Sequence, residues 1–335
     1  MKKYAKLASV FLTIILTLGV AAGCEKKNGL TRINLNEVVH SVFYAPQYVS
    51  LEKGFFEEEG LKIELSVGQG ADKSMTALVS GDSQIALLGT EAGIYVYNEG
   101  KENYAVSFAQ LTQRAGNFLV SRENEENFEW DNLIGKSVIE GRAGGMPQLV
   151  LEYILKERGI IPNKDVEIIN NIAFNSTAGA FAGKVGDYTI EFEPSATALE
   201  DEGVGYVVAS LGKDSGYIPY TVYMATKDYI SKNPDIIQSF TNAIYKGQKW
   251  INSHSSKETA EVIAPHFPES DIDTLTKIIE RYKAQDSWKE TPIFEEEGLR
   301  LLEKVMDMGG ELAASVPYED LVTTKFAEKA VLETK

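Results

Sequence analysis

The chain has few of the residues on which catalytic and metal chemistry most often depends. Among its 335 residues are one cysteine, Cys24, and three histidines, His40, His254 and His266. A single cysteine excludes an intrachain disulfide framework and a cysteine-rich metal site, and no two histidines stand at the spacing of a metal motif. The G-x-S-x-G and H-E-x-x-H patterns are also missing. We therefore expect no enzyme, no bound metal and no cofactor.

Positive charge is scarce as well. Lysine and arginine together number 33 against 49 aspartates and glutamates, which gives a net charge of −16. This balance opposes binding to nucleic acid, which needs a basic surface. The hydrophobic share of 44% and the charged share of 24% are ordinary for a globular protein. The length suffices for about two domains.

The first residues have the order of a secretory signal. Lys2, Lys3 and Lys6 precede the apolar run 7–20, which is shorter than the roughly 20 residues that cross a bilayer. Small residues 21–23 then lead directly to Cys24. This predicts a signal peptide over 1–23. The position of Cys24 resembles the lipobox of bacterial lipoproteins, which implies a lipidated cysteine, a tether over 24–29 and a location on the extracytoplasmic face of the cell membrane.

Strand-like and helix-like segments alternate from residue 33 to residue 226. The first series has strand-like segments at 33–39, 61–67, 84–88 and 104–110. A polar stretch over 121–131 reads as a junction loop, and a second series follows at 136–140, 166–170, 188–192 and 206–210. A further strand is predicted over 220–226, and mostly helix follows from residue 233. The alternation predicts an α/β fold with mostly parallel sheets.

Several short motifs carry a family resemblance. They are Tyr44-Ala45-Pro46-Gln47-Tyr48, Glu52-Lys53-Gly54-Phe55-Phe56, Ala77-Leu78-Val79-Ser80-Gly81, Leu133-Ile134-Gly135-Lys136 and Glu193-Pro194. In this order they resemble solute-binding proteins of ABC importers, in the branch that takes up aliphatic sulfonates, nitrate, taurine and thiamine pyrimidine precursors. The resemblance covers most of residues 33–330.

That resemblance implies a two-lobed periplasmic-binding-protein-like type II fold, with two mostly parallel sheets flanked by helices and a hinge of two crossovers. Lobe 1 would comprise 30–112 plus 220–335, and lobe 2 would comprise 113–219. The protein would act as a monomer that captures a small molecule by hinge closure. Its partners would be an ABC permease and ATPase, with the membrane reached through the lipid anchor and no nucleic acid involved.

Ligands of such sheets bind at the carboxyl ends of the strands. The loop 141–147 places glycines before a helix start, where free N–H groups can hold an anion. A carboxylate such as Glu193 in a closed cleft would instead require N–H donors or positive charge on the ligand, and whether Glu191 or Glu193 faces the cleft stays open. Aromatic residues in the loops could stack on a ring. The expected contacts are Phe43, Tyr44, Gly70, Thr90, Glu91, Gln110, Arg142, Gly144, Gly145, Met146, Asn175, Glu193 and Tyr220.

Two ligand classes follow from these residues. The acidic, amide and aromatic side chains favour an N-heterocycle, either a thiamine pyrimidine precursor or a flavin-like ring. Arg142 and the glycine loop favour the alternative, a sulfonate or nitrate anion. Two other functions are weaker: a surface sensor module, and an enzyme like the eukaryotic thiamine pyrimidine synthase, which uses a cysteine-rich motif that this chain lacks.

Overall fold

The computed structural model describes residues 29–334. The predicted signal peptide, Cys24 and all but the end of the tether lie outside these residues. The described residues from Arg32 onward belong to one compact unit. Within residues 29–334 no helix combines the length and the apolar character needed to cross a membrane.

The first sheet, sheet A, has five strands in the order β2-β1-β3-β10-β4. They are β2 (Leu61–Val67), β1 (Thr31–Glu37), β3 (Ile85–Gly89), β10 (Thr221–Thr226) and β4 (Ala105–Thr112). β1 is parallel to β3, whereas β10 pairs antiparallel with both β3 and β4, so β1, β3 and β4 run in one direction. Every residue of β3 and β4 is buried, as expected for strands covered on both faces.

The second sheet, sheet B, has the order β7-β6-β8-β5-β9. They are β7 (Glu167–Ile169), β6 (Ser137–Ile139), β8 (Tyr188–Phe192), β5 (Asn117–Ser121) and β9 (Tyr206–Ser210). Four of these strands share a direction, and β5 alone is reversed. The predicted α/β fold is therefore confirmed, with β5 reversed in sheet B and β10 reversed relative to β1, β3 and β4 in sheet A.

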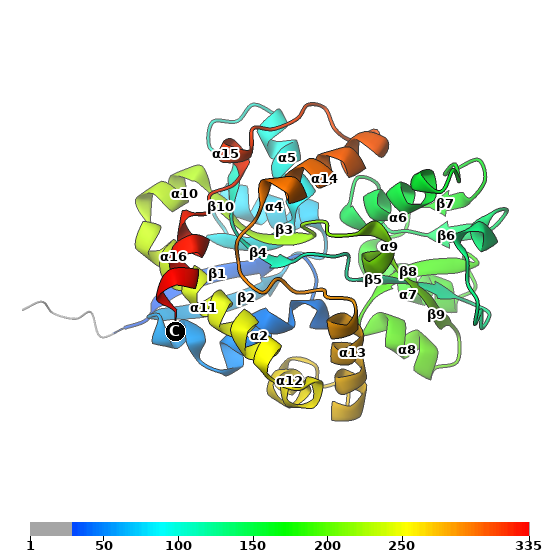
Figure 1. Cartoon of the computed structure of the whole chain (residues 1–335), viewed down its shortest axis with the longest axis horizontal. Coiled ribbons are helices and arrows are strands. Elements are labelled where there is room, and N and C mark those ends of the chain that lie inside the picture. The colour runs from blue at the N-terminus through cyan, green and yellow to red at the C-terminus, as the bar shows by residue number, and fades with distance from the viewer. Residues whose placement is uncertain (1–28, 335) are drawn as a thin grey trace, which may run out of the picture. The chain divides into compact units, whose positions relative to one another are not determined.

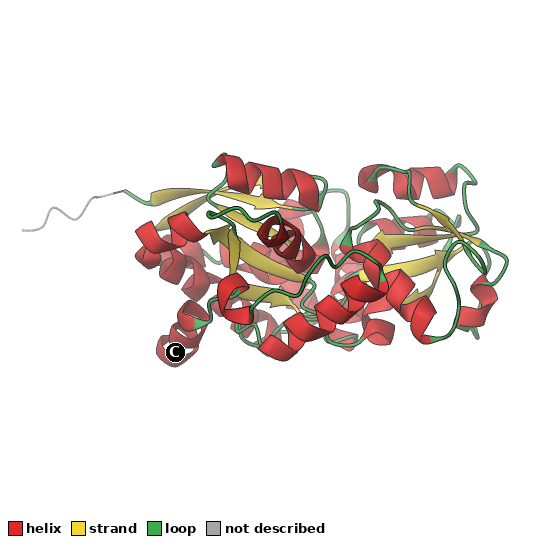
Figure 2. Cartoon of the chain, turned by 90° about the horizontal axis from the view of Figure 1, so that it is seen from above, coloured by secondary structure: helices red, strands yellow, loops and turns green. Residues whose placement is uncertain are grey.

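Helices flank both sheets (Figure 2). Those of the first two series are α2 (Ala45–Glu52), α3 (Phe55–Glu58), α4 (Ala71–Ser80), α5 (Thr90–Asn98), α6 (Met146–Glu157), α7 (Thr177–Ala182), α8 (Ser195–Asp201) and α9 (Leu211–Ser215). The C-terminal helices are α10 (Lys227–Lys232), α11 (Pro234–Ser253), α12 (Ser256–Ile263), α13 (Ile272–Ala284), α14 (Glu296–Met308), α15 (Tyr318–Leu321) and α16 (Lys325–Glu333). Figure 1 shows α4 and α5 on one side of sheet A, and α2 and α11 on the other.

Sequence signals explain where several helices begin. A proline lies in the first turn of α2, α6 and α11, where its missing N–H costs no hydrogen bond. α12 begins with a capping box. The Ser255 side chain accepts a hydrogen bond from the Glu258 amide, and the Glu258 side chain accepts one from the Ser255 amide. Ile237, Phe240 and Ile244 form the buried stripe of α11, at the predicted helical spacing.

The C-terminal helix α13 connects the two sheet regions. It packs against α12, and its last turn reaches the segment that joins β4 to β5. The Tyr282 hydroxyl donates to the Gly116 carbonyl at 2.9 Å, and Gln285 Nε2 donates to the Ala115 carbonyl at 3.0 Å. On the sheet B side, Arg281 forms ion pairs with Glu193 and Glu200. The chain therefore crosses between the sheets twice, and α13 adds a noncovalent connection beside the crossings.

Candidate functional site

A cavity of about 400 Å³, here called the central cavity, lies between the two sheet regions. It is bounded on the sheet A side by Val38, Val39, Tyr44, Gln69, Gly70, Ala71, Asp72, Lys73, Gly89, Glu91, Tyr220 and Thr221, and on the sheet B side by Arg142, Gly145, Met146, Pro147, Asn170, Asn171, Ile172, Ala173 and Phe192. Val38 and Gly89 mark the carboxyl ends of β1 and β3, so the cavity occupies the position expected for a ligand in an open α/β sheet.

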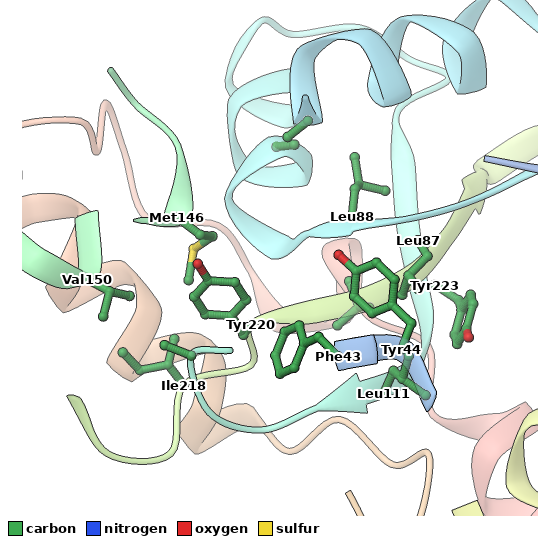
Figure 3. Packing of buried hydrophobic residues seen from close by; sticks show 14 of the residues in the cluster. Phe43, Tyr44, Leu87, Leu88, Leu111, Met146, Val150, Ile218, Tyr220 and Tyr223 are labelled. Atoms are coloured by element: carbon green, nitrogen blue, oxygen red, sulfur yellow. The ribbon is translucent and has the colours of Figure 1, made fainter. Parts of the chain in front are cut away.

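Aromatic rings form one wall of the central cavity. Tyr44, Phe192 and Tyr220 line it, while Phe43 lies fully buried behind them, with ring centroids 5.7–5.8 Å from all three. Figure 3 shows Tyr220 between Phe43 and Met146, with its hydroxyl on the side of Met146. That hydroxyl is buried and has no hydrogen-bond partner within residues 29–334. The wall thus offers a ring surface together with one unused polar group.

Three helices begin at the cavity. α4 starts beside Gly70, α5 beside Gly89 and α6 beside Gly145, and all three glycines belong to the lining. Gly70 has φ +142°, a backbone conformation that other residues rarely adopt, and a Cβ there would lie 2.7 Å from Asp72 Oδ1. Unpaired amides and the helix dipole make each of these ends electropositive.

Acidic side chains offset this potential. Glu91 is 1% exposed, and its Oε2 atom has no hydrogen-bond partner among the described residues. Burial raises the pKa of Glu91 to about 7, against the lowering effect of nearby backbone amides and of Arg142. Arg142 in turn lies beside Asp72, with 3.6 Å between Nε and Oδ1.

A second cavity of about 330 Å³ adjoins the first and shares with it Val39, Gln69, Pro147 and Phe192. Glu140 and Glu191 line it. Glu191 accepts hydrogen bonds from Thr189 at 2.7 Å and Thr177 at 3.2 Å, and burial raises its pKa to about 7.

Glu140 is the more isolated of these two carboxyls. Both of its oxygens are buried without a hydrogen-bond partner in the described part of the chain. Burial, and then the charge of Glu152, raise its pKa to about 9. No group of three or more potential metal ligands occurs within residues 29–334.

The comparisons with known proteins decide the family. The family model described as NMT1/THI5 like matches residues 42–257, which include most of the lining of both cavities. The chain belongs to the NMT1/THI5-like family. This confirms the resemblance found in the sequence motifs.

Several proteins that are similar to this chain are named as binding proteins. Binding protein YtlA of Bacillus subtilis (strain 168) is 45% identical over 330 residues, which cover 98% of this chain and 97% of YtlA. The periplasmic nitrate-binding protein NrtA of Synechocystis PCC 6803 superposes with a TM-score of 0.74 at 17% identity, covering 91% of this chain and 90% of NrtA. The alkanesulfonate-binding protein SsuA of Xanthomonas axonopodis pv. citri, bound to MOPS, gives 0.71 at 12% identity, with coverage of 88% and 99%. At these identities the two structures establish the fold.

The structure brings seven of the expected contact residues together around the central cavity. They are Tyr44, Gly70, Glu91, Arg142, Gly145, Met146 and Tyr220. Their common feature is position: each lies in a loop or first helical turn beyond a strand, or at the return to sheet A. The motif over 141–147 lies, as expected, at the start of α6.

Six other expected contacts lie outside the central cavity and have partners within the protein. Phe43 supports the aromatic wall from behind. The Thr90 hydroxyl donates to the Pro219 carbonyl at 2.7 Å, and Gln110 Nε2 donates to the Thr112 carbonyl at 3.0 Å. The Gly144 carbonyl accepts from the Tyr95 hydroxyl at 3.0 Å, and Asn175 Nδ2 donates to Gln69 Oε1 at 3.1 Å.

Glu193 is the last of these six. It lines the second cavity together with Glu191, so both carboxylates left open by the sequence belong to that cavity. Its charge is already neutralised, because Arg281 Nη1 lies 2.5 Å from Oε1 and the Thr197 amide donates to Oε2 at 2.9 Å.

Sequence reasoning did not select Phe192, Ile172 and Lys73, which also line the central cavity. Phe192 ends β8 next to Glu191, so the alternation of the strand could have shown that it faces the other way from that carboxylate.

Proposed function

We propose that this protein is the extracytoplasmic solute-binding subunit of an ABC importer, anchored to the membrane through a lipid on Cys24. It acts as a monomer and passes its ligand to a membrane permease driven by an ATPase. The proposal is supported by the family membership, by the relatives named as binding proteins, and by the central cavity between the sheets.

Binding proceeds by closure of two lobes, 30–112 plus 220–335 and 113–219, about the crossovers at 113–116 and 216–220. Contacts between the two proposed lobes, made beside the central cavity, support this division. The Tyr95 hydroxyl reaches the Gly144 carbonyl, and Arg142 lies beside Asp72. These contacts would form as the lobes close and would break as they open.

The ligand we propose is a small N-heterocycle that bears N–H donors, in the class of aminopyrimidine thiamine precursors or flavin-like rings. The observation that carries this choice is Glu91, a buried carboxyl group at the cavity with an unpaired oxygen. An acceptor left unpaired in a buried site costs about 1–3 kcal/mol, so a ligand N–H that reaches it gains selectivity. Tyr44, Phe192 and Tyr220 supply the ring-stacking surface.

A sulfonate or nitrate anion is the second candidate. Arg142 and the starts of α4, α5 and α6 favour it, because cations and free backbone amides hold anions. Against it, each of these positive groups already has a carboxylate nearby, either Asp72 or Glu91.

Native mass spectrometry of unlipidated protein, residues 25–335, tests the ligand class. The protein is purified without unfolding, so that a ligand with micromolar affinity, about −8 kcal/mol, stays bound. We expect a copurified aromatic heterocycle with N–H groups. A copurified sulfonate or inorganic anion would contradict the proposed ligand and favour the second candidate.

A further inference from the structure

Glu91 has an unusual position for a buried acid. It belongs to the first turn of α5, yet its carboxylate also lies near the first turn of α6, which comes from the other sheet. The backbone amides of Glu91 and Ala92, and that of Met146 in α6, each act to lower its pKa. A Cβ on Gly89 would overlap the carboxylate, so the side chain folds back over the end of β3. The carboxylate therefore lies in the cavity wall, between two helix ends.

This is the environment in which proteins hold an external anion. Two helix starts and the Arg142 guanidinium border the same cavity as the carboxylate, and the backbone amides there and Arg142 favour its charged form. The third helix start is arranged in a similar way, since Asp72 lies in the first turn of α4 beside Gly70 and close to Arg142. The chain thus supplies its own negative charges at the places where a ligand's charge would otherwise bind.

We propose that the Glu91 carboxylate is a resident anion, which occupies the anion cradle between α5 and α6 and thereby restricts the central cavity to neutral or cationic ligands with N–H donors. This rests on the proposed function and deepens it, because it names the residue that sets the charge class of the ligand. An anionic ligand would find the anion cradle already occupied and would be repelled by the negative charge of Glu91. Removal of the side chain would leave a cradle with space and net positive potential.

The decisive experiment is a gain of binding. Glu91→Ala is titrated with methanesulfonate, nitrate and sulfate after ligand depletion, by calorimetry at low ionic strength, where charge effects are least screened. We expect wild-type protein to show no saturable binding at pH 8, and Glu91→Ala to bind at least one of the anions at least tenfold more tightly. Glu99→Ala is the matched control, because Glu99 follows the last turn of the same helix, pairs with Lys101 and is 57% exposed. It should behave as wild type.

A second measurement needs no variant. Lowering the pH from 8.5 to 5.5 protonates Glu91, so the wild type should gain anion affinity by at least tenfold, and Glu91→Ala should not. The other groups that act electrostatically on or with Glu91 are Arg142 and the hydroxyls of Tyr44, Tyr95 and Tyr220. Burial raises the pKa of all three tyrosines, so none of them titrates in this range.

Tight anion binding by the wild type at pH 8 would overturn the proposal. So would the absence of any gain in anion affinity both in Glu91→Ala and in the wild type at pH 5.5. Should Glu91→Ala fail to fold, the pH comparison and Glu91→Gln, which keeps the volume and removes the charge, decide in the same way. The anion titration uses no physiological ligand. A copurified ligand that is cationic but not a heterocycle would therefore contradict the proposed ligand class, while the proposal that Glu91 is a resident anion would still hold.

Discussion

Tyr220 directly precedes β10 and Tyr223 lies within it, and the two differ in the use of their hydroxyls. The Tyr220 hydroxyl borders the central cavity without a partner in the described residues, whereas the Tyr223 hydroxyl donates to Gln47 Oε1 at 3.0 Å. We expect Tyr220→Phe not to lower the free energy of unfolding, because it removes a buried hydroxyl without a partner. It should weaken binding of the copurified ligand about three- to tenfold, since one hydrogen bond contributes about 0.5–1.5 kcal/mol.

The matched variant Tyr223→Phe should show the reverse pattern. It loses a buried hydrogen bond, so the free energy of unfolding should fall by about 1 kcal/mol while ligand affinity stays the same. Urea unfolding and calorimetry measure the two effects. Unchanged affinity in Tyr220→Phe would show that the ligand does not use this hydroxyl.

The buried carboxyls make stability depend on pH. In the unfolded chain Glu140 releases its proton near pH 4.5, but in the folded protein it does so only near pH 9. Between these values the folded state holds more protons, so the free energy of unfolding falls as the pH rises. We expect Glu140 to account for a loss of about 2 kcal/mol between pH 7 and pH 9.

Urea unfolding at pH 7 and at pH 9 measures this loss. Glu140→Gln cannot titrate at this position, so most of the decrease should disappear in that variant, and only the smaller contribution of Glu91 and Glu191 should remain. Glu64→Gln, at a carboxylate that is 44% exposed, should keep the wild-type decrease. A decrease of the same size in Glu140→Gln would assign the effect to other groups.

Much of the candidate site was predictable at the level of position but not of orientation. The sequence places Thr90 and Glu91 together after β3, and only the backbone direction shows that Glu91 lines the cavity while Thr90 bonds to the Pro219 carbonyl. For Glu193 the sequence could not supply the deciding fact, because its partner Arg281 follows 88 residues later, on α13.

Among the elements, the strand β5 is one that the sequence pattern did not predict. Its five residues are all buried, and it follows β4 after a short crossover, with no helix between them. The α/β pattern predicts a helix between parallel strands, so a reversed strand reached by a direct crossover gives no such signal. The polar stretch after it read as the junction, although the chain had already entered the second sheet.

A buried ion pair is one of the contacts that connect the helix α13 to sheet B. Glu193 is fully buried, and Arg281 pairs with both Glu193 and Glu200, at 2.5 Å and 2.8 Å. Arg281→Met would leave the Glu193 charge buried and unpaired. We expect the free energy of unfolding to fall by about 3–5 kcal/mol, measured by urea unfolding.

Lys277→Met provides the control on the same helix. Lys277 is 50% exposed and lies 3.2 Å from Glu200, so its loss should cost less than about 1 kcal/mol. The double variant Arg281→Met, Glu193→Gln removes both charges and should recover part of the loss. Equal effects of the two single variants would contradict a special role for Arg281.

For the molecule as a whole, one hydrogen bond between the proposed lobes allows the proposed hinge closure to be tested. The Tyr95 hydroxyl of α5 donates to the Gly144 carbonyl, which belongs to the other proposed lobe. We expect ligand to reduce the radius of gyration of depleted wild-type protein in X-ray scattering. Tyr95→Phe should weaken ligand binding about three- to tenfold, because it removes one hydrogen bond from the closed form.

Tyr97→Phe is the comparison for this test. Tyr97 lies on the same helix, but its hydroxyl donates to Asp320 in α15, at 2.7 Å and away from the cavity. It should leave affinity and scattering unchanged. An identical radius of gyration with and without ligand would contradict hinge closure.

The place of β10 in sheet A has a consequence for biosynthesis. This strand is inserted between β3 and β4, although the chain makes it more than a hundred residues after β4. A growing chain that emerges N-terminus first can complete sheet B before residues 221–226 exist, but sheet A stays split until they arrive. The half that holds the start of the chain is thus completed after the other half, and a ribosome-bound nascent chain remains incompletely folded until at least residue 226 of 335 has been made.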